Sequence, residues 1–167
     1  FAAELARARA YWAARLDALP PAPALPLAVD PMRLTDPHFS RRHARLGPEA
    51  WRRLKARAAG AGLTPSNVLL GAYAEVIGTW SRSDTFTLNL TVGDRRPLAE
   101  GVDEVLGVFT TLTPLAVHGA CRGPFRERAR AQQQQLARDL DHRAFSGIEV
   151  QRLIAQRAGD PHAGLLP

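Results

Sequence analysis

Apolar residues recur at steps of three and four along several stretches, a spacing that places them on one face of an α-helix. The first stripe of this kind consists of Phe1, Leu5, Ala8, Trp12 and Leu16. Later stretches with the same spacing are 47–62, 64–80, 123–142 and the segment that begins at Ser146. The pattern therefore predicts five helices, spread over both ends of the chain.

Two of these helices carry clear start signals. Thr64 is a suitable N-cap and Pro65 suits the first helical position. Ser146 and Glu149 have the spacing of a capping box. The helix over 64–80 is apolar almost all round, so we expect it to be buried on every side.

After this helix the hydrophobic period changes to two, which is typical of a strand. Phe86, Leu88, Leu90 and Val92 alternate with polar residues. A second strand is predicted over 105–117, where Pro114 marks it as an edge or bulged strand. The segment 38–46 is a weaker strand candidate. Two strands make a marginal sheet alone, so we expect further strands outside this sequence.

A connector rich in proline, Leu19–Pro31, follows the first helix. Its five prolines exclude a helix or a central strand. Its leucines indicate an extended strap that packs on a surface. Such a strap runs between two lobes or along one. We divide the chain into residues 1–31, a helix with this inter-lobe strap, and residues 32–167, which would then be part of a lobe.

Composition narrows the function classes. The 167 residues carry a formal charge of +6, almost all of the positive charge from arginine. These arginines are scattered among alanines without a row of aromatic residues, which argues against a nucleic-acid partner. No apolar run approaches the roughly 20 residues of a membrane span, so no membrane partner is expected. A single cysteine, Cys121, fits a reducing, cytoplasmic setting.

Three groups of residues are candidates for a metal, acid–base or anion-binding site. His118 and Cys121 stand three apart, but a metal would need another ligand and none is near in sequence. Asp141 and His142 could form an acid–base pair, although they lie at a predicted helix end, where solvated polar residues are expected. The turn 93–96, Gly-Asp-Arg-Arg, could bind a phosphate or carboxylate, or be a charged turn. No metal site is expected.

Four ordered stretches resemble the heterocyclization domains of nonribosomal peptide synthetases, a subfamily of the condensation domains. They are YWAARLDALPPAPALPL, GLTPSNVLLGAYAEVIGTWS, LNLTVGDRRPL followed by VLGVFTTLTPL, and LDHRAFSGIEVQRLIAQR. The resemblance implies an α/β fold, an α+β two-layer sandwich like one lobe of chloramphenicol acetyltransferase. It places the chain in an incomplete C-terminal lobe of a two-lobed domain.

The resemblance also implies an activity. Such domains join aminoacyl and peptidyl thioesters held on carrier proteins, and cyclodehydrate cysteine, serine or threonine to thiazoline or oxazoline. The substrates arrive on 4′-phosphopantetheine arms, and no directly bound cofactor is implied. The expected partners are carrier proteins and the missing N-terminal lobe.

The family's catalytic signatures are expected outside this chain. A pair of aspartates in a DxxxxD pattern would lie upstream of Phe1, and a Pro-Val-Val-Phe-Thr-Ser motif and a later aspartate downstream of Pro167. We therefore expect no catalytic residue within the chain, and an isolated chain that is inactive.

The stretch Leu106–Leu112 resembles the family's Gly-Asp-Phe-Thr motif. Gly107, Val108, Phe109, Thr110 and Thr111 are accordingly predicted to lie in a strand near the reaction channel. Val108 stands where the family usually has aspartate, and valine can neither accept a hydrogen bond nor tune a neighbouring group. Cyclisation could therefore be altered, or the domain could perform plain condensation. The alternative is a degenerate, noncatalytic condensation-like module that docks carrier proteins.

Arg95 aligns with an arginine that, in the wider family, pairs across the lobes with an aspartate of the first lobe. A guanidinium can hold a carboxylate through two parallel hydrogen bonds. Without that lobe, Arg95 is expected to be solvent-facing or flexible.

Overall fold

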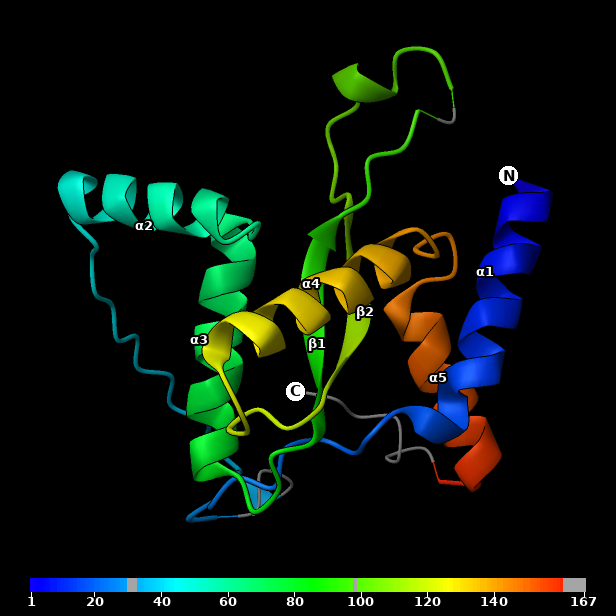
Figure 1. Cartoon of the computed structure of the whole chain (residues 1–167). Coiled ribbons are helices and arrows are strands. Elements are labelled where there is room, and N and C mark those ends of the chain that lie inside the picture. Colours follow the sequence, from blue (N-terminus) through cyan, green and yellow to red (C-terminus); the bar gives the residue numbers. More distant parts are fainter. Residues whose placement is uncertain (30–32, 98, 161–167) are drawn as a thin grey trace.

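The structure, a computed structural model, describes residues 1–29, 33–97 and 99–160. Helices and strands are mixed, as the α/β class requires (Figure 1). The helices and strands in chain order are α1 (Ala2–Arg15), α2 (Pro48–Gly60), α3 (Pro65–Trp80), β1 (Phe86–Gly93), β2 (Thr110–Val117), α4 (Phe125–Leu140) and α5 (Gly147–Ala158). The predicted boundary between residues 31 and 32 lies outside the described residues.

The helix starts follow the capping chemistry of the sequence. Thr64 Oγ1 accepts a hydrogen bond from the Asn67 backbone N–H at 3.2 Å, and Pro65 is the first residue of α3. At α5, Ser146 Oγ accepts from the Glu149 N–H at 3.3 Å, and Glu149 Oε2 accepts from the Ser146 N–H at 2.8 Å. The predicted capping box is therefore confirmed.

The strands β1 and β2 form an antiparallel hairpin. Its register is given by its end pairs, Phe86 with Val117 and Gly93 with Thr110. The Thr87 N–H bonds Pro21 O at 2.9 Å, on the side away from β2. Since outward and inward residues alternate along a strand, Asn89 also turns its backbone groups outward. Pro114 faces Asn89, so its missing N–H removes no bond from the hairpin.

The proline-rich connector lies along the outer edge of β1. Thr87 Oγ1 donates to Pro20 O at 2.5 Å, and the Ala24 N–H donates to Ser81 Oγ at 3.0 Å. The described part of the connector thus packs on the protein surface, although Leu27, which is 64% exposed, does not pack as predicted. Its hydrogen bonds also satisfy the first residues of an otherwise open strand edge.

The outer edge of β2 is covered by the start of α5. A Cβ added to Gly147 would lie 2.6 Å from Leu112 O, so the helix meets the strand backbone at a distance that only glycine permits. Pro114 is fully buried beside this contact. β2 is therefore an edge strand, as Pro114 predicted, and α5 shields its edge from solvent.

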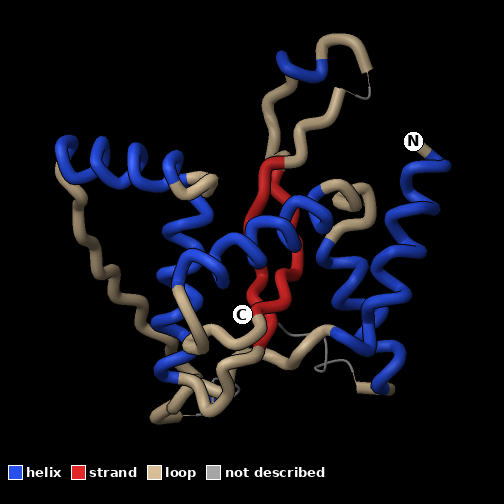
Figure 2. Tube along the Cα trace, viewed as in Figure 1, coloured by secondary structure: helices blue, strands red, loops and turns tan. Residues whose placement is uncertain are grey.

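Three small apolar clusters hold the elements together. Helix α4 crosses one face of the hairpin, with α3 on one side and α1 and α5 on the other (Figures 1 and 2). The cluster between α1 and α5 contains Ala8, Trp12, Ala144, Phe145 and Val150. The cluster between α3 and the sheet contains Ala74, Phe86, Leu88, Val117 and Ala120. The cluster at the start of α3 contains Ala58, Leu63 and Ala129.

The expectation that α3 is buried on every side is wrong for this chain. One face of the helix packs on the sheet and α4, but the other is bare. The large apolar side chains of the bare face are between 50% and 66% exposed: Leu69, Tyr73, Val76 and Trp80. The sequence pattern reports apolarity all round, whereas the elements present here cover one side only.

Two strand predictions also need correction. Residues 38–46 form no strand; they are exposed and make no strand pairing, and Phe39 is 95% exposed. The second strand begins at Thr110, and Val105–Phe109 belong to the preceding loop. Branched residues favour an extended backbone, but a strand also needs a partner for its backbone groups, and neither segment has one along its full length.

Candidate functional site

The hairpin loop, described over residues 94–97 and 99–109, carries Arg95 and the motif residues Gly107, Val108 and Phe109. It projects beyond the end of the sheet, away from the helices (Figure 1). At its base the Asp94 N–H donates to Phe109 O at 2.7 Å, which extends the ladder by one pair. The loop therefore presents its residues on a protruding arm at one end of the hairpin.

Arg95 organises this loop. Its guanidinium Nη1 donates to Val102 O at 2.5 Å and to Val105 O at 3.0 Å, and its Cζ lies 3.7 Å from the centroid of the Phe109 ring. The residue is exposed, as predicted. The guanidinium is nevertheless held by two carbonyls and an aromatic face. The remaining N–H groups of the guanidinium can donate hydrogen bonds to a carboxylate.

The five motif residues do not line an enclosed site in this chain. Val108 is 90% exposed in the loop, next to Gly107. Thr110 starts β2 opposite Gly93, and Thr111 follows opposite Val92. Gly107 and Val108 therefore lie in an open loop, and Thr110 and Thr111 lie at the start of β2.

Beside the loop, Asp94 gathers two arginines that sequence reasoning did not bring together. Arg96 Nε lies 3.0 Å from Asp94 Oδ1, and Arg143 Nε lies 3.4 Å from the same oxygen. The side chains of Asp94 and Arg96 are largely buried, and the Arg96 guanidinium lies over the Phe1 ring at 5.2 Å. The charged turn 93–96 is thus tied to α1 and to the segment before α5. Asp94 and Arg96 therefore serve the structure, whereas Arg95 of the same turn is exposed to solvent.

A second buried polar cluster surrounds Asp139, which is 0% exposed. Asp139 Oδ1 accepts from Tyr11 Oη at 2.7 Å and from Gln135 Nε2 at 2.9 Å, and it forms an ion pair with Arg15. The His142 ring stacks on Tyr11 with centroids 3.8 Å apart. The cluster fastens α1 to the end of α4, although these residues are more than 120 positions apart.

Burial raises the pKa of Asp139 above its ordinary value of 3.8, while the hydrogen bond from Tyr11 and the charge of Arg15 act in the opposite direction. Burial, followed by the hydrogen bond to Asp139, likewise raises the pKa of Tyr11 above 10.0. A raised carboxyl pKa means that the folded state binds the proton more tightly than the unfolded state. Stability is then greatest at low pH and declines as pH rises through the folded-state pKa.

This pKa shift gives a testable pH dependence. We expect the free energy of unfolding of the wild type, relative to Asp139→Asn, to fall as pH rises from about 4 towards neutrality. Urea unfolding of both proteins across this range measures the difference, and the asparagine variant cancels the contribution of all other groups. Parallel stability curves for the two proteins would show that Asp139 does not bind its proton more tightly on folding.

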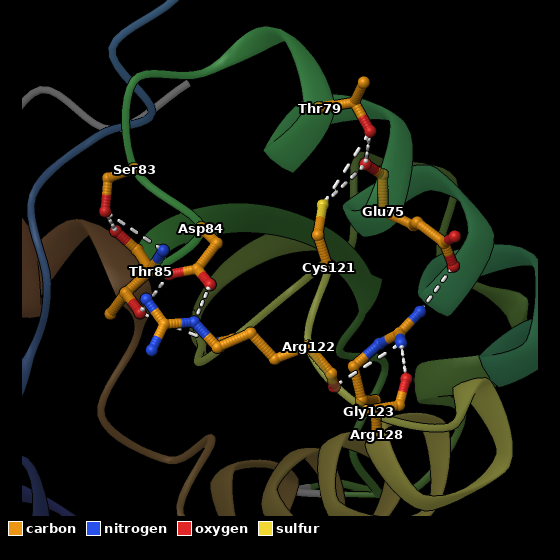
Figure 3. A network of polar contacts seen from close by, with 10 residues as sticks. Glu75, Thr79, Ser83, Asp84, Thr85, Cys121, Arg122, Gly123 and Arg128 are labelled. Carbon is orange, nitrogen blue, oxygen red and sulfur yellow. Dashed lines mark hydrogen bonds and ion pairs between the residues drawn. The ribbon is translucent and has the colours of Figure 1, made fainter.

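The other candidate groups do not assemble into sites. Cys121 Sγ contacts α3, 3.6 Å from Glu75 O and 3.7 Å from Thr79 Oγ1 (Figure 3). His142 Nδ1 lies 2.8 Å from Arg138 O, and its ring faces Tyr11 and not Asp141. Within the described residues, no three His, Cys, Asp or Glu side chains are placed to hold a metal ion. Nor is any helix there long and apolar enough to cross a membrane.

Around Cys121, two ion pairs fix the turn that leads into α4 (Figure 3). Arg122 Nε lies 2.5 Å from Asp84 Oδ2, and Arg128 Nη2 lies 2.5 Å from Glu75 Oε2. Arg128 also donates to Gly123 O. These pairs, like the clusters around Asp94 and Asp139, join segments far apart in sequence, so spacing along the chain gave no signal for them.

Comparison with known proteins identifies the fold. A sequence profile of the condensation domain matches residues 2–162. The chain belongs to the condensation domain family. Pyochelin synthetase PchF of Pseudomonas aeruginosa is 48% identical over 153 residues, which cover 92% of this chain and 8% of PchF. Phenyloxazoline synthase MbtB of Mycobacterium tuberculosis is 35% identical over 90% of this chain and 11% of its own length.

The structural comparison points the same way. The crystal structure of the EpoB NRPS cyclization-docking bidomain from Sorangium cellulosum superposes with a TM-score of 0.83 at 39% identity. The match covers 93% of this chain and 32% of the bidomain. This chain is thus similar to part of a condensation domain, and the relatives that it matches are many times its length.

Proposed function

We propose that this chain is part of a heterocyclising condensation domain. The intact domain joins carrier-bound aminoacyl or peptidyl thioesters and cyclodehydrates cysteine, serine or threonine to thiazoline or oxazoline. The observation that carries the proposal is the combined likeness of sequence and fold, 39% identity with a TM-score of 0.83, to a structure described as a cyclization domain. The substrates are presented on 4′-phosphopantetheine arms of carrier proteins.

In this proposal the hairpin loop forms one wall of the reaction channel. Arg95 Nη1 holds the loop through its hydrogen bonds to Val102 O and Val105 O. The other N–H groups of the Arg95 guanidinium pair with a carboxylate of the N-terminal lobe. The loop is not assigned acid–base chemistry at position 108, because valine provides no proton and no acceptor. Its part is to align the amine with the thioester, and alignment of this kind supplies much of the rate of a bimolecular step.

The bare face of α3 supports the proposal that this chain works only as part of a larger domain. Four large apolar side chains on one helix face, from Leu69 to Trp80, are more than monomeric proteins usually expose together. Beyond the connector, the outer edge of β1 near Asn89 also has backbone groups directed away from β2. Further strands and the second lobe would cover these surfaces, and the isolated chain is accordingly proposed to be inactive.

The experiment uses the complete parent protein, given a pair of loaded carrier proteins, with the products resolved by mass spectrometry. We expect an amide product that has lost one water. Arg95→Ala should lower the rate of condensation and cyclisation together, by about 10- to 100-fold, because the loop loses its alignment. Arg82→Ala, an exposed arginine outside the loop, should leave the rate unchanged. An intact protein that forms neither the amide nor the ring would contradict the proposal.

Val108 favours a second candidate function, a noncatalytic module that docks carrier proteins. The exposed valine stands where the resemblance expects aspartate, in the loop nearest the channel. Val108→Asp in the parent protein separates the two candidates. A heterocyclising domain should lose water at a changed rate when the carboxylate is restored, whereas a docking module should form no amide with either residue.

A further inference from the structure

A groove lies where α2 meets the starts of α3 and α4. Its volume is about 490 Å³, within the size range of ligand and peptide-anchor sites. Its floor is apolar and is formed by Ala50, Leu54, Ala58, Ala61, Leu63, Val68 and Phe125. In Figure 1, α2 extends away from the sheet and meets the start of α3 at its C-terminal end.

Three arginines border this groove: Arg53, Arg57 and Arg126. All three are exposed. Arg53 lies 3.9 Å from Glu49, a long contact between two well-exposed side chains. Across residues 1–29, 33–97 and 99–160, Arg57 and Arg126 form no ion pair. The groove thus has an apolar floor and a positively charged border with little internal neutralisation.

We propose that this groove docks an acidic amphipathic helix of a neighbouring domain. The apolar floor accepts side chains at helical spacing, and the arginines face the acidic residues on the flanks of the same helix. The family relationship makes such a neighbour available, because this chain spans only 8% of PchF. The inference does not depend on ring formation and would also hold for a noncatalytic domain.

Other occupants fit the groove less well. An extended peptide binds by adding a strand to an exposed sheet edge, and neither β1 nor β2 lines this groove. A single-stranded nucleic acid would need stacking surfaces, and Phe125 is the one aromatic residue in the lining. A membrane surface favours a protruding apolar face with basic flanks, whereas this apolar surface is concave.

The test measures binding of fluorescein-labelled synthetic peptides to the 167-residue protein by fluorescence anisotropy at low ionic strength. The first peptide is a helix with leucines at positions i, i+3, i+4 and i+7 and glutamates between them. The second has the same composition with the leucine stripe scrambled, and the third has lysine in place of glutamate. We expect the first peptide to bind at least about five-fold more tightly than the other two, with an affinity that weakens as salt is added.

Matched variants assign this binding to the groove. Arg57→Gln with Arg126→Gln should weaken binding of the first peptide by about five-fold or more, since it removes two exposed charges that would face the acidic flanks of the helix. Arg7→Gln with Arg82→Gln removes the same charge outside the groove and should change affinity less than about two-fold. Leu54→Gln tests the apolar floor independently and should also weaken binding, with circular dichroism confirming that each variant is folded.

Several outcomes would overturn the proposal. Equal binding of the ordered and scrambled peptides would show charge attraction without a groove. Unchanged binding by the Arg57 and Arg126 double variant would place the contact elsewhere. Tighter binding of duplex DNA or of anionic phosphatidylglycerol vesicles would assign the surface to another class of partner. Failure of the complete parent protein to bind the first peptide would show that the remainder of its own domain fills the groove.

Discussion

Asp139→Ala is expected to lower the free energy of unfolding by about 3–5 kcal/mol, the cost of breaking a buried ion pair from one side. The carboxylate is fully buried and serves three donors, from Tyr11, Gln135 and Arg15. Alanine removes the acceptor that the three donors share, so that Arg15 and Gln135 keep only Tyr11 Oη as an acceptor, and the Arg15 charge loses its counter-ion. Because the cluster joins α1 to α4, we further expect α1 to lose its hydrogen-exchange protection first.

Urea unfolding followed by circular dichroism measures this effect. Asp141→Ala is the matched control, since it removes an exposed carboxylate just after α4 and should change stability by less than about 0.5 kcal/mol. Tyr11→Phe removes one donor and should cost about 1 kcal/mol. Equal stabilities for the Asp139 and Asp141 variants would show that the buried cluster does not hold α1 in place.

Gly147→Ala is expected to destabilise the protein by about 1–3 kcal/mol, the usual cost of overpacking. The new Cβ would lie 2.6 Å from Leu112 O and 2.7 Å from Leu112 C, both backbone atoms that cannot rotate away. The start of α5 must therefore move off the edge of β2. Such a shift also disturbs the Ser146 capping box, which lies at the same turn.

Gly60→Ala is the control for this change. Gly60 is helical, in the last turn of α2, and a Cβ there meets no atom within 4 Å. Alanine should therefore stabilise the protein, by about 0.4–1 kcal/mol. If close packing at Gly147 decides the outcome, thermal unfolding should show a lowered melting temperature for Gly147→Ala and a raised one for Gly60→Ala. A stabilised Gly147 variant would mean that α5 can retreat from β2 at no cost.

The sequence motifs identified the family and the position of the hairpin loop in the chain, but they did not predict the conformation of the loop. The sequence predicted a continuous strand through Val108, because branched residues favour an extended backbone. In the structure the chain leaves the sheet at Phe109, and Arg95 holds the loop by bonds to Val102 O and Val105 O. Strand pairing needs a facing partner, and the residues opposite Val105–Phe109 turn away after Asp94.

The sequence by itself determined the local elements. Thr64 and Ser146 start helices because their side chains bond backbone groups three residues away, and the alternation from Phe86 to Val92 predicts the strand that β1 forms. Only the tertiary structure decided which surfaces are covered. Tyr11 meets Asp139 across 128 positions, and the apolar residues of α3 from Leu69 to Trp80 remain bare. The physical reason is range: caps and periodicity act between near neighbours in sequence, whereas burial depends on elements brought together from distant parts of the chain, or from beyond it.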